Sequence, residues 1–194
     1  MLKPSYPIRT ERLILRPYTP ADLDALYAIH RLPEVARYLY WEPRDREQTR
    51  EALERKINET ALLEEGQSLT LAVELAATGE LLGDVLLIWH SRAQRSGEIG
   101  YVFHPGHHGR GYATEAAGAM LELGFDGLDL HRVVGRLDAR NEASARVLEK
   151  LGMRREAHFV DNEIMKGEWT SELVYAILLR EWRARHPSTP APAG

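Results

Sequence analysis

A glycine-rich segment containing three histidines lies where a predicted strand ends and a predicted helix begins. It reads His104-Pro105-Gly106-His107-His108-Gly109-Arg110-Gly111-Tyr112-Ala113-Thr114. Gly109 and Gly111 allow the chain to turn tightly and a ligand to approach the backbone amides. The helix that follows begins with unpaired N–H groups and the positive end of its dipole. The segment therefore predicts an anion site, most naturally for phosphate, with Arg110 as an added cationic contact.

Two common phosphate-binding patterns do not fit this segment. A Walker loop continues into Gly-Lys-Ser/Thr, and here no such sequence follows. The dinucleotide fingerprint G-x-G-x-x-G would need glycine at position 114, which is Thr114. A glycine-rich connection without a ligand is the alternative interpretation.

A second polar segment, Asp138-Ala139-Arg140-Asn141-Glu142-Ala143-Ser144, follows the next predicted strand. If the strands over 97–104 and 131–138 are parallel, both polar segments lie at one edge of the sheet, where such folds bind ligands. Asn141 is expected to cap the helix over 142–151, with Ser144 at its third position. Such a cap would still lie at the mouth of the crevice.

Three imidazoles within five positions, His104, His107 and His108, raise the alternative of a metal site. No carboxylate lies within this loop to complete or support such a site. The histidines are therefore interpreted as polar lining, and no metal is predicted.

The spacing of apolar residues predicts the elements that position these segments. Strands are expected over 10–17, 69–75, 80–90, 97–104, 131–138, 154–160 and 169–178, and helices after Thr19 and over 46–64, 112–126 and 142–151. The one strand–helix–strand crossover should be right-handed, which makes strands 97–104 and 131–138 parallel. The order predicts an α+β fold with helices on both faces of one mixed, mostly antiparallel sheet of six to seven strands.

Composition narrows the classes of protein. With 194 residues, 44% of them hydrophobic and 28% charged, the chain is expected to form one globular domain. Its net charge of −4 argues against a generally basic nucleic-acid binder. The absence of cysteine excludes disulfides, thiolate metal sites and a cysteine nucleophile.

Neither end of the chain predicts a membrane or export signal. Residues 1–4 lead into no apolar segment, and the longest apolar run, 173–179, is far shorter than the roughly 20 residues of a membrane span. We therefore expect a cytoplasmic protein with a single domain over 1–183. The Pro-rich remainder, 184–194, is expected to be a disordered tail.

Five stretches together carry a family resemblance. They are Thr10-Glu11-Arg12-Leu13-Ile14-Leu15-Arg16, Gly97-Glu98-Ile99-Gly100-Tyr101, Gly109-Arg110-Gly111-Tyr112-Ala113-Thr114-Glu115-Ala116, Asn141-Glu142-Ala143-Ser144 and Glu149-Lys150-Leu151-Gly152-Met153. Over roughly residues 10–181 the chain resembles the GNAT superfamily of acyl-CoA-dependent N-acyltransferases, in the branch of ribosomal-protein-alanine acetyltransferases (RimJ/RimL-like). The resemblance implies the GNAT sheet, in which the parallel strand pair splays apart.

The resemblance also implies which residues hold the cosubstrate, acetyl-CoA. The family's pyrophosphate-binding pattern, Arg/Gln-x-x-Gly-x-Gly/Ala, begins here at His108, which departs from it, so the backbone amides over 109–114 are the expected contacts. The implied pyrophosphate contacts are His108, Gly109, Arg110, Gly111, Tyr112, Ala113 and Thr114. The pantetheine arm would lie beside Tyr101, Val102 and Phe103, and Asn141 and Ser144 would also contact CoA.

In this family an amine attacks the thioester directly, without an acyl-enzyme. The predicted catalytic residues are Glu98 as general base, Ser144 as general acid or sulfur ligand, and Asn141. Glu172 on the last strand is the competing base, and a solvated carboxylate is the alternative role for Glu98. An amide near Val102 is the expected oxyanion donor.

In relatives the region of Tyr38, Tyr40 and Trp41 lies over the acceptor site. These side chains are predicted to bind the acceptor, with simple core packing as the alternative. The predicted function is acetyl transfer from acetyl-CoA to a protein N-terminus or a small-molecule amine. Two alternatives stay open: a non-catalytic acyl-CoA sensor on the same fold, and a different donor such as succinyl-CoA. The expected partners are these two substrates, without nucleic acid or membrane, and a homodimer is allowed.

Overall fold

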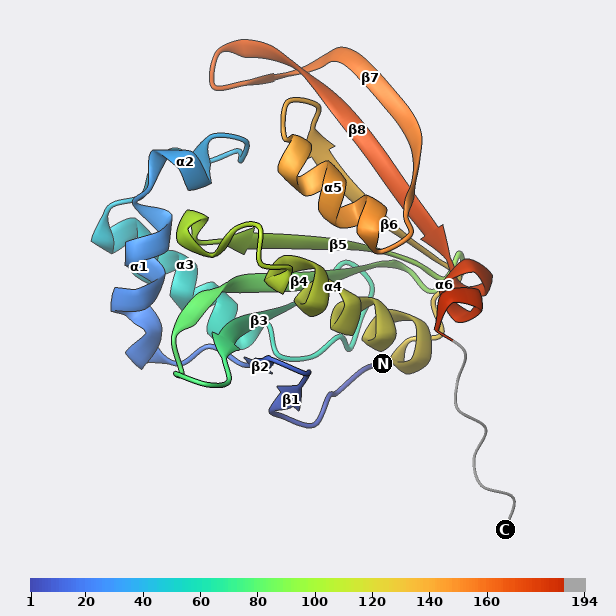
Figure 1. Cartoon of the computed structure of the whole chain (residues 1–194), viewed down its shortest axis with the longest axis horizontal. Helices are drawn as coiled ribbons and strands as arrows, with labels where there is room; N and C mark the ends of the chain where they lie inside the picture. Colours follow the sequence, from blue (N-terminus) through green and yellow to red (C-terminus); the bar gives the residue numbers. More distant parts are fainter. Residues whose placement is uncertain (187–194) are drawn as a thin grey trace.

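Eight strands form one sheet in the computed structural model, which describes residues 1–186 (Figure 1). The strands are β1 (Ile8–Arg9), β2 (Leu13–Arg16), β3 (Ser68–Leu75), β4 (Leu81–Ser91), β5 (Ser96–Phe103), β6 (Arg132–Asp138), β7 (Arg154–Met165) and β8 (Glu168–Leu178). Their order across the sheet is β1-β2-β3-β4-β5-β6-β8-β7. The helices are α1 (Leu23–His30), α2 (Pro33–Ala36), α3 (Arg46–Asn58), α4 (Tyr112–Glu122), α5 (Glu142–Lys150) and α6 (Leu179–Arg185).

All neighbouring strands are antiparallel except β5 and β6, which are parallel as predicted. This confirms the α+β class and the mixed sheet. The parallel pairing covers only three positions and ends at Glu98 with Val134. Beyond this pair, β5 continues to Phe103 and β6 to Asp138. The two strands therefore separate toward the edge where the polar segments follow them.

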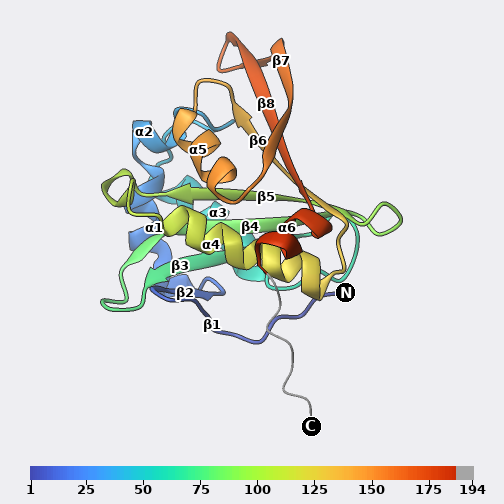
Figure 2. The ribbon, with the colours of Figure 1, turned by 45° about the vertical axis from the view of Figure 1, so that its right-hand side comes forward.

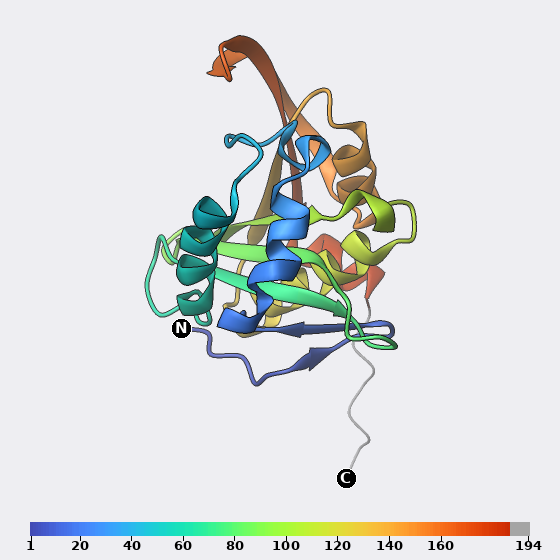
Figure 3. The ribbon, with the colours of Figure 1, turned by 90° about the vertical axis from the view of Figure 1, so that its left-hand side faces the viewer.

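Helices cover both faces of the sheet (Figures 2 and 3). On one face, Leu26 of α1 and Leu53 of α3 pack with Tyr18 and Ala72 in a small core. On the other face, α4 contributes to a larger core with β2–β6 and β8, in which Leu13 and Leu15 are fully buried. α5 packs on this second face, where its Leu148 side chain lies against Gly135 of β6.

Some boundaries differ from the sequence predictions, each for a local reason. The sheet has one strand more than predicted, because the two-residue β1 folds back onto β2. The helix expected over 46–64 ends at Asn58, because Leu62 pairs with Leu2 and is buried in the larger core. The helix expected over 112–126 widens into a π-helical turn over Leu123–Gly127. The tail expected over 184–194 is wrong at its start, because α6 continues to Arg185 and packs Trp182 into the larger core. From residue 187 the expected tail lies outside the described residues.

The β7–β8 hairpin extends away from the rest of the sheet, and its tip bends toward α2 (Figure 1). At the tip, Lys166 Nζ donates a hydrogen bond to the carbonyl oxygen of Ala36 at 2.7 Å. The hydroxyl of Tyr40 binds the Glu163 carboxylate nearby, at 2.9 Å from Oε2. These contacts join the hairpin to the last residue of α2 and to the segment that follows it.

None of the helices within residues 1–186 combines the length and hydropathy needed to cross a membrane.

His30 of α1 gives the fold a specific pH dependence. Its side chain is 2% exposed, and burial lowers its pKa from 6.5 to about 4. Between these values the unfolded chain takes up a proton that the folded protein does not. The stabilisation is therefore complete above pH 6.5 and is lost as the pH falls toward 4, at about 1.4 kcal/mol per pH unit and about 3 kcal/mol in all.

Urea unfolding from pH 7 to pH 4.5 measures this effect as the slope of unfolding free energy against pH. His30→Asn should flatten the slope, whereas His158→Gln, at an exposed position of β7, should leave it unchanged. Identical slopes for wild type and His30→Asn would contradict the prediction.

Candidate active site

The segment between β5 and α4 folds into a cradle of backbone amides. Gly109 and Gly111 have positive φ values of 76° and 82°, and Gly111 is the N-cap of α4. None of the six amides from Gly109 to Thr114 donates a hydrogen bond to another group within residues 1–186. Consecutive free amides at a helix N-terminus bind anionic oxygens. The geometry therefore suits the phosphate site that the sequence predicts.

The histidine side chains of this segment turn in different directions. His104 Nδ1 accepts from the Gly106 amide at 3.0 Å, and His107 Nε2 lies 3.2 Å from a carboxylate oxygen of Glu80. His108 Nε2 lies 3.2 Å from the carbonyl oxygen of Phe103, while Arg110 is exposed. Within residues 1–186, no group of three side chains could hold a metal ion. The His108 ring is thus occupied with β5, and the backbone amides are the stronger candidates for contacting an anion.

The separated end of β5 lies next to this cradle. Beyond Glu98, the side of β5 that faces β6 has no strand partner. Val102 pairs with Asp84 of β4 and the Phe103 carbonyl oxygen lies against His108, so the backbone groups of Tyr101 and the Phe103 amide form the unpaired part of this edge. An extended ligand can pair with such an edge as an added strand would. The Tyr101 hydroxyl spans the separation and donates to the Ser144 carbonyl oxygen at 3.0 Å.

The start of α5 forms the other wall of this separation. Asn141 is its N-cap, as predicted, and Asn141 Oδ1 accepts from the Ser144 amide at 3.1 Å. The Ser144 hydroxyl has no hydrogen-bond partner within residues 1–186. Asp138 is held by Arg140 through two side-chain contacts of 2.7 and 2.9 Å. The structure therefore brings Tyr101, Asn141 and Ser144 together.

Glu98 lies on the face of the sheet that α1 and α3 cover, opposite the face that carries α4 and α5. Its side chain is 20% exposed, with Oε2 3.3 Å from His90 Nε2 and 3.5 Å from Arg136 Nε. Arg136 also binds Glu172 at 3.1 Å, so both candidate bases share one guanidinium. Burial raises the pKa of Glu98, although His90 and Arg136 oppose this. A carboxylate with a raised pKa is a better proton acceptor than an exposed one.

The three aromatic residues predicted to bind the acceptor do not form one pocket. Trp41 packs against His30 with the two rings tilted by 46° and their centroids 4.9 Å apart, and it lies under Arg44. Tyr38 lies beneath the guanidinium of Arg140, 6.0 Å away.

Tyr40 is 73% exposed, and its hydroxyl end points to carboxylates. Partial burial of the hydroxyl, its bond to Glu163 and the charges of Glu172 and Glu98 raise the pKa of Tyr40 to about 12. Tyr40 is thus the aromatic residue of the three whose hydroxyl lies close enough to Glu98, Glu163 and Glu172 to be affected by their charges.

Sequence reasoning missed Arg136, His90 and Glu163. Arg136 lies two residues after Val134, the register partner of Glu98, so its position on the same face follows once the register is known. The hairpin pairing of β4 with β5 likewise places His90 beside Glu98. Glu163 lies beyond the predicted end of its strand at 160, where alternation gave no signal.

Comparison with known proteins agrees with this geometry. A family model described as an acetyltransferase (GNAT) domain matches residues 12–154. The uncharacterized N-acetyltransferase YnaD of Bacillus subtilis (strain 168) is 32% identical over 175 residues, covering 90% of this chain and 98% of the relative. The spermidine N(1)-acetyltransferase of Escherichia coli (strain K12) is 24% identical over 173 residues, covering 89% of each.

Among solved structures, the acetyltransferase (GNAT family) from Bacillus anthracis superposes with a TM-score of 0.80 at 32% identity. The match covers 90% of this chain and 99% of that one.

Proposed function

The chain belongs to the GNAT family of acetyltransferases, and from this premise we propose that it transfers the acetyl group of acetyl-CoA directly to a primary amine where β5 and β6 separate. The observation that carries the proposal is the row of free amides from Gly109 to Thr114 beside the unpaired edge of β5. The amides suit the pyrophosphate, and the edge suits the pantetheine arm. Asn141 and Ser144 then flank the thioester.

The proposed reaction needs the protein mainly to hold the amine next to the thioester and to accept a proton from the amine. Holding amine and thioester together supplies up to roughly 7–11 kcal/mol of barrier reduction. The amine arrives largely as ammonium, so Glu98 accepts its proton directly or through water. The amine nitrogen bonds to the carbonyl carbon and the carbon–sulfur bond breaks, while a backbone amide near Val102 stabilises the charge on the carbonyl oxygen. Ser144 donates a hydrogen bond or a proton to the departing sulfur.

A small polycationic amine is the acceptor class that we propose. Three carboxylates, Glu98, Glu163 and Glu172, are close enough to Tyr40 to raise its pKa, and Arg136 offsets part of their charge. Such a surplus of negative charge favours a substrate with more than one ammonium group. The spermidine N(1)-acetyltransferase relative supports this class. A protein N-terminus, the acceptor of the RimJ/RimL-like branch, carries only one such group at its reacting end.

Release of free thiol from acetyl-CoA and succinyl-CoA tests the proposal, with spermidine, lysine and alanine-starting peptides as acceptors. We expect release that depends on acetyl-CoA and on spermidine. Thiol release with the peptides but not with spermidine would support acetyltransferase activity and would contradict the proposed class of acceptor. CoA binding by calorimetry without thiol release for any amine would instead indicate a non-catalytic sensor.

Ser144→Ala is expected to lower kcat about tenfold and to leave the KM for acetyl-CoA nearly unchanged. The reason is that the hydroxyl acts on a thiolate whose pKa of ~8.5 already makes it a fair leaving group. Steady-state kinetics from pH 6 to pH 9 measure the effect. Ser5→Ala, at an exposed position, is the control. Unchanged turnover with an unchanged pH profile would rule out the role.

A further inference from the structure

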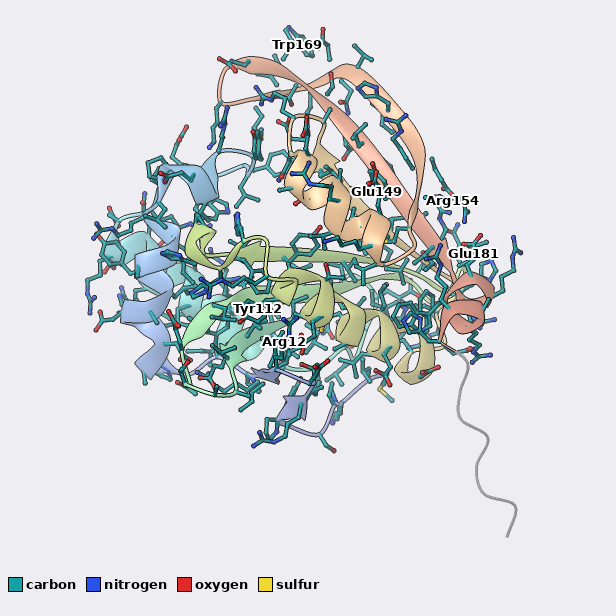
Figure 4. The ribbon with its side chains drawn as sticks, in the orientation of Figure 1. Arg12, Tyr112, Glu149, Arg154, Trp169 and Glu181 are labelled. Carbon is teal, nitrogen blue, oxygen red and sulfur yellow. The ribbon has the colours of Figure 1, made fainter. Side chains whose placement is uncertain are left out.

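An ion pair joins the start of β2 to the first turn of α4. Arg12 Nε and Nη2 both lie 2.7 Å from Glu115 Oε2, while the Arg12 amide and the Thr10 hydroxyl bind Oε1 at 2.8 and 2.6 Å. One carboxylate thus receives four contacts from a segment more than 100 positions away. Figure 4 shows Arg12 beside Tyr112, and the guanidinium carbon lies 4.8 Å from the centre of that ring.

The same guanidinium holds the backbone of the glycine-rich segment. Arg12 Nη1 donates to the carbonyl oxygen of Arg110 at 3.0 Å. In a trans peptide the C=O of one residue and the N–H of the next point in opposite directions within one plane. The bond to Arg110 therefore fixes the Gly111 N–H so that it points away from Arg12 and stays free for a ligand. Gly111 has a φ of 82° and no side chain to hold this conformation by itself.

Arg12 also affects the charge at this helix start. A carboxylate in the first turn of α4 would repel an anionic ligand at the N-terminal amides. Burial would raise the pKa of Glu115, but the bonds from Thr10 and Arg12 outweigh it and lower the pKa, so the group is ionised at neutral pH. The guanidinium of Arg12 compensates that charge at contact distance.

We propose that Arg12 is a positioning residue for the pyrophosphate of CoA, which orients the Gly111 amide through the Arg110 carbonyl and compensates the Glu115 carboxylate. This inference rests on the proposed function, because it assumes that these amides bind CoA. It adds a residue immediately before β2, outside the glycine-rich segment, to the donor site.

Calorimetric binding of CoA to Arg12→Ala, Arg12→Lys, Glu115→Gln and the double variant Arg12→Ala/Glu115→Gln tests the proposal. Arg12→Ala should raise the Kd of CoA about tenfold, the size expected for loss of one charge-assisted hydrogen bond. The Kd of Arg12→Lys for CoA should lie between those of Arg12→Ala and wild type, because lysine keeps the positive charge but lacks the planar guanidinium that makes several hydrogen bonds at once. The double variant should bind more tightly than Arg12→Ala, since the uncompensated carboxylate is gone, yet more weakly than wild type.

A truncated donor separates positioning from general damage. Acetylpantetheine has no pyrophosphate, so Arg12→Ala should raise the KM for acetyl-CoA about tenfold and leave kcat/KM for acetylpantetheine unchanged. Arg50→Ala, which breaks an exposed arginine–glutamate cluster on α3, is the matched control and should bind CoA as wild type does. The proposal is overturned if Arg12→Ala binds CoA within twofold of wild type, or if both donors weaken equally. If wild type binds no CoA, the proposed function itself is wrong.

Discussion

Glu98→Gln is expected to lower kcat/KM for the amine by about 10²–10⁴-fold at neutral pH, the range that a positioned general base contributes. Glutamine keeps the shape of the side chain and can still donate to or accept from its neighbours, but it cannot accept the ammonium proton. The KM for acetyl-CoA should change little, because the donor contacts come from β5, the glycine-rich segment and α5. Steady-state kinetics with both substrates varied measure the two effects separately.

The pH profile distinguishes Glu98 from a merely structural carboxylate. Because burial raises the pKa of Glu98, its carboxylate form should appear only above the ordinary carboxyl range near ~4.3. Wild-type kcat/KM should therefore increase with pH as Glu98 loses its proton. In Glu98→Gln this increase with pH should be absent. Glu172→Gln tests the competing base that shares Arg136. Full activity in Glu98→Gln together with loss in Glu172→Gln would assign the base to Glu172.

Lys56→Met is expected to lower the free energy of unfolding by about 3–5 kcal/mol, the cost of leaving a buried carboxylate without its ion-pair partner. The Asp84 side chain is 2% exposed, and its Oδ2 accepts from Lys56 Nζ and from the Tyr18 hydroxyl, each at 2.9 Å. Its Oδ1 has no partner within residues 1–186. Methionine fills the volume of the lysine stem, so charge rather than packing dominates the loss.

Urea unfolding at pH 7 measures this effect, and a double-mutant cycle isolates the pair. Lys56→Met/Asp84→Asn should be less destabilised than the sum of its single variants, because neither charge then remains unpaired. Arg50→Ala, which breaks an ion pair in solvent, is the control and should show no measurable loss. Equal small losses for Lys56→Met and Arg50→Ala would contradict the assigned role of the buried pair.

Local patterns predicted much of the framework. Alternation predicted a strand over 10–17, which contains β2, and the strand–helix–strand crossover predicted the parallel pair. The cap at Asn141 followed from residue type and position alone. All three features depend on short-range spacing or on a chirality that most folds share.

Long-range partners could not be predicted in the same way. The register between β5 and β6 decides that Arg136 lies beside Glu98, and no local spacing encodes it. The contacts of Arg12 with Glu115 and of Tyr40 with Glu163 join residues 103 and 123 positions apart. Trp41 looked like a partner of Tyr40 in the sequence, but tertiary packing turned it toward His30. The sequence therefore indicates what chemistry a single side chain can perform, but not which distant residues lie beside it in the fold.

The β7–β8 hairpin has an evolutionary consequence. Its tip meets the end of α2 through Lys166 and the following segment through Glu163. Both sides of this contact are distant in sequence from the amides of residues 109–114. Substitutions at the hairpin tip can therefore change the charge around Tyr40, on which Glu163 and Glu98 both act, without altering those amides. In terms of the proposed function, relatives with the same donor site can then differ in their amine acceptors through changes in this turn alone.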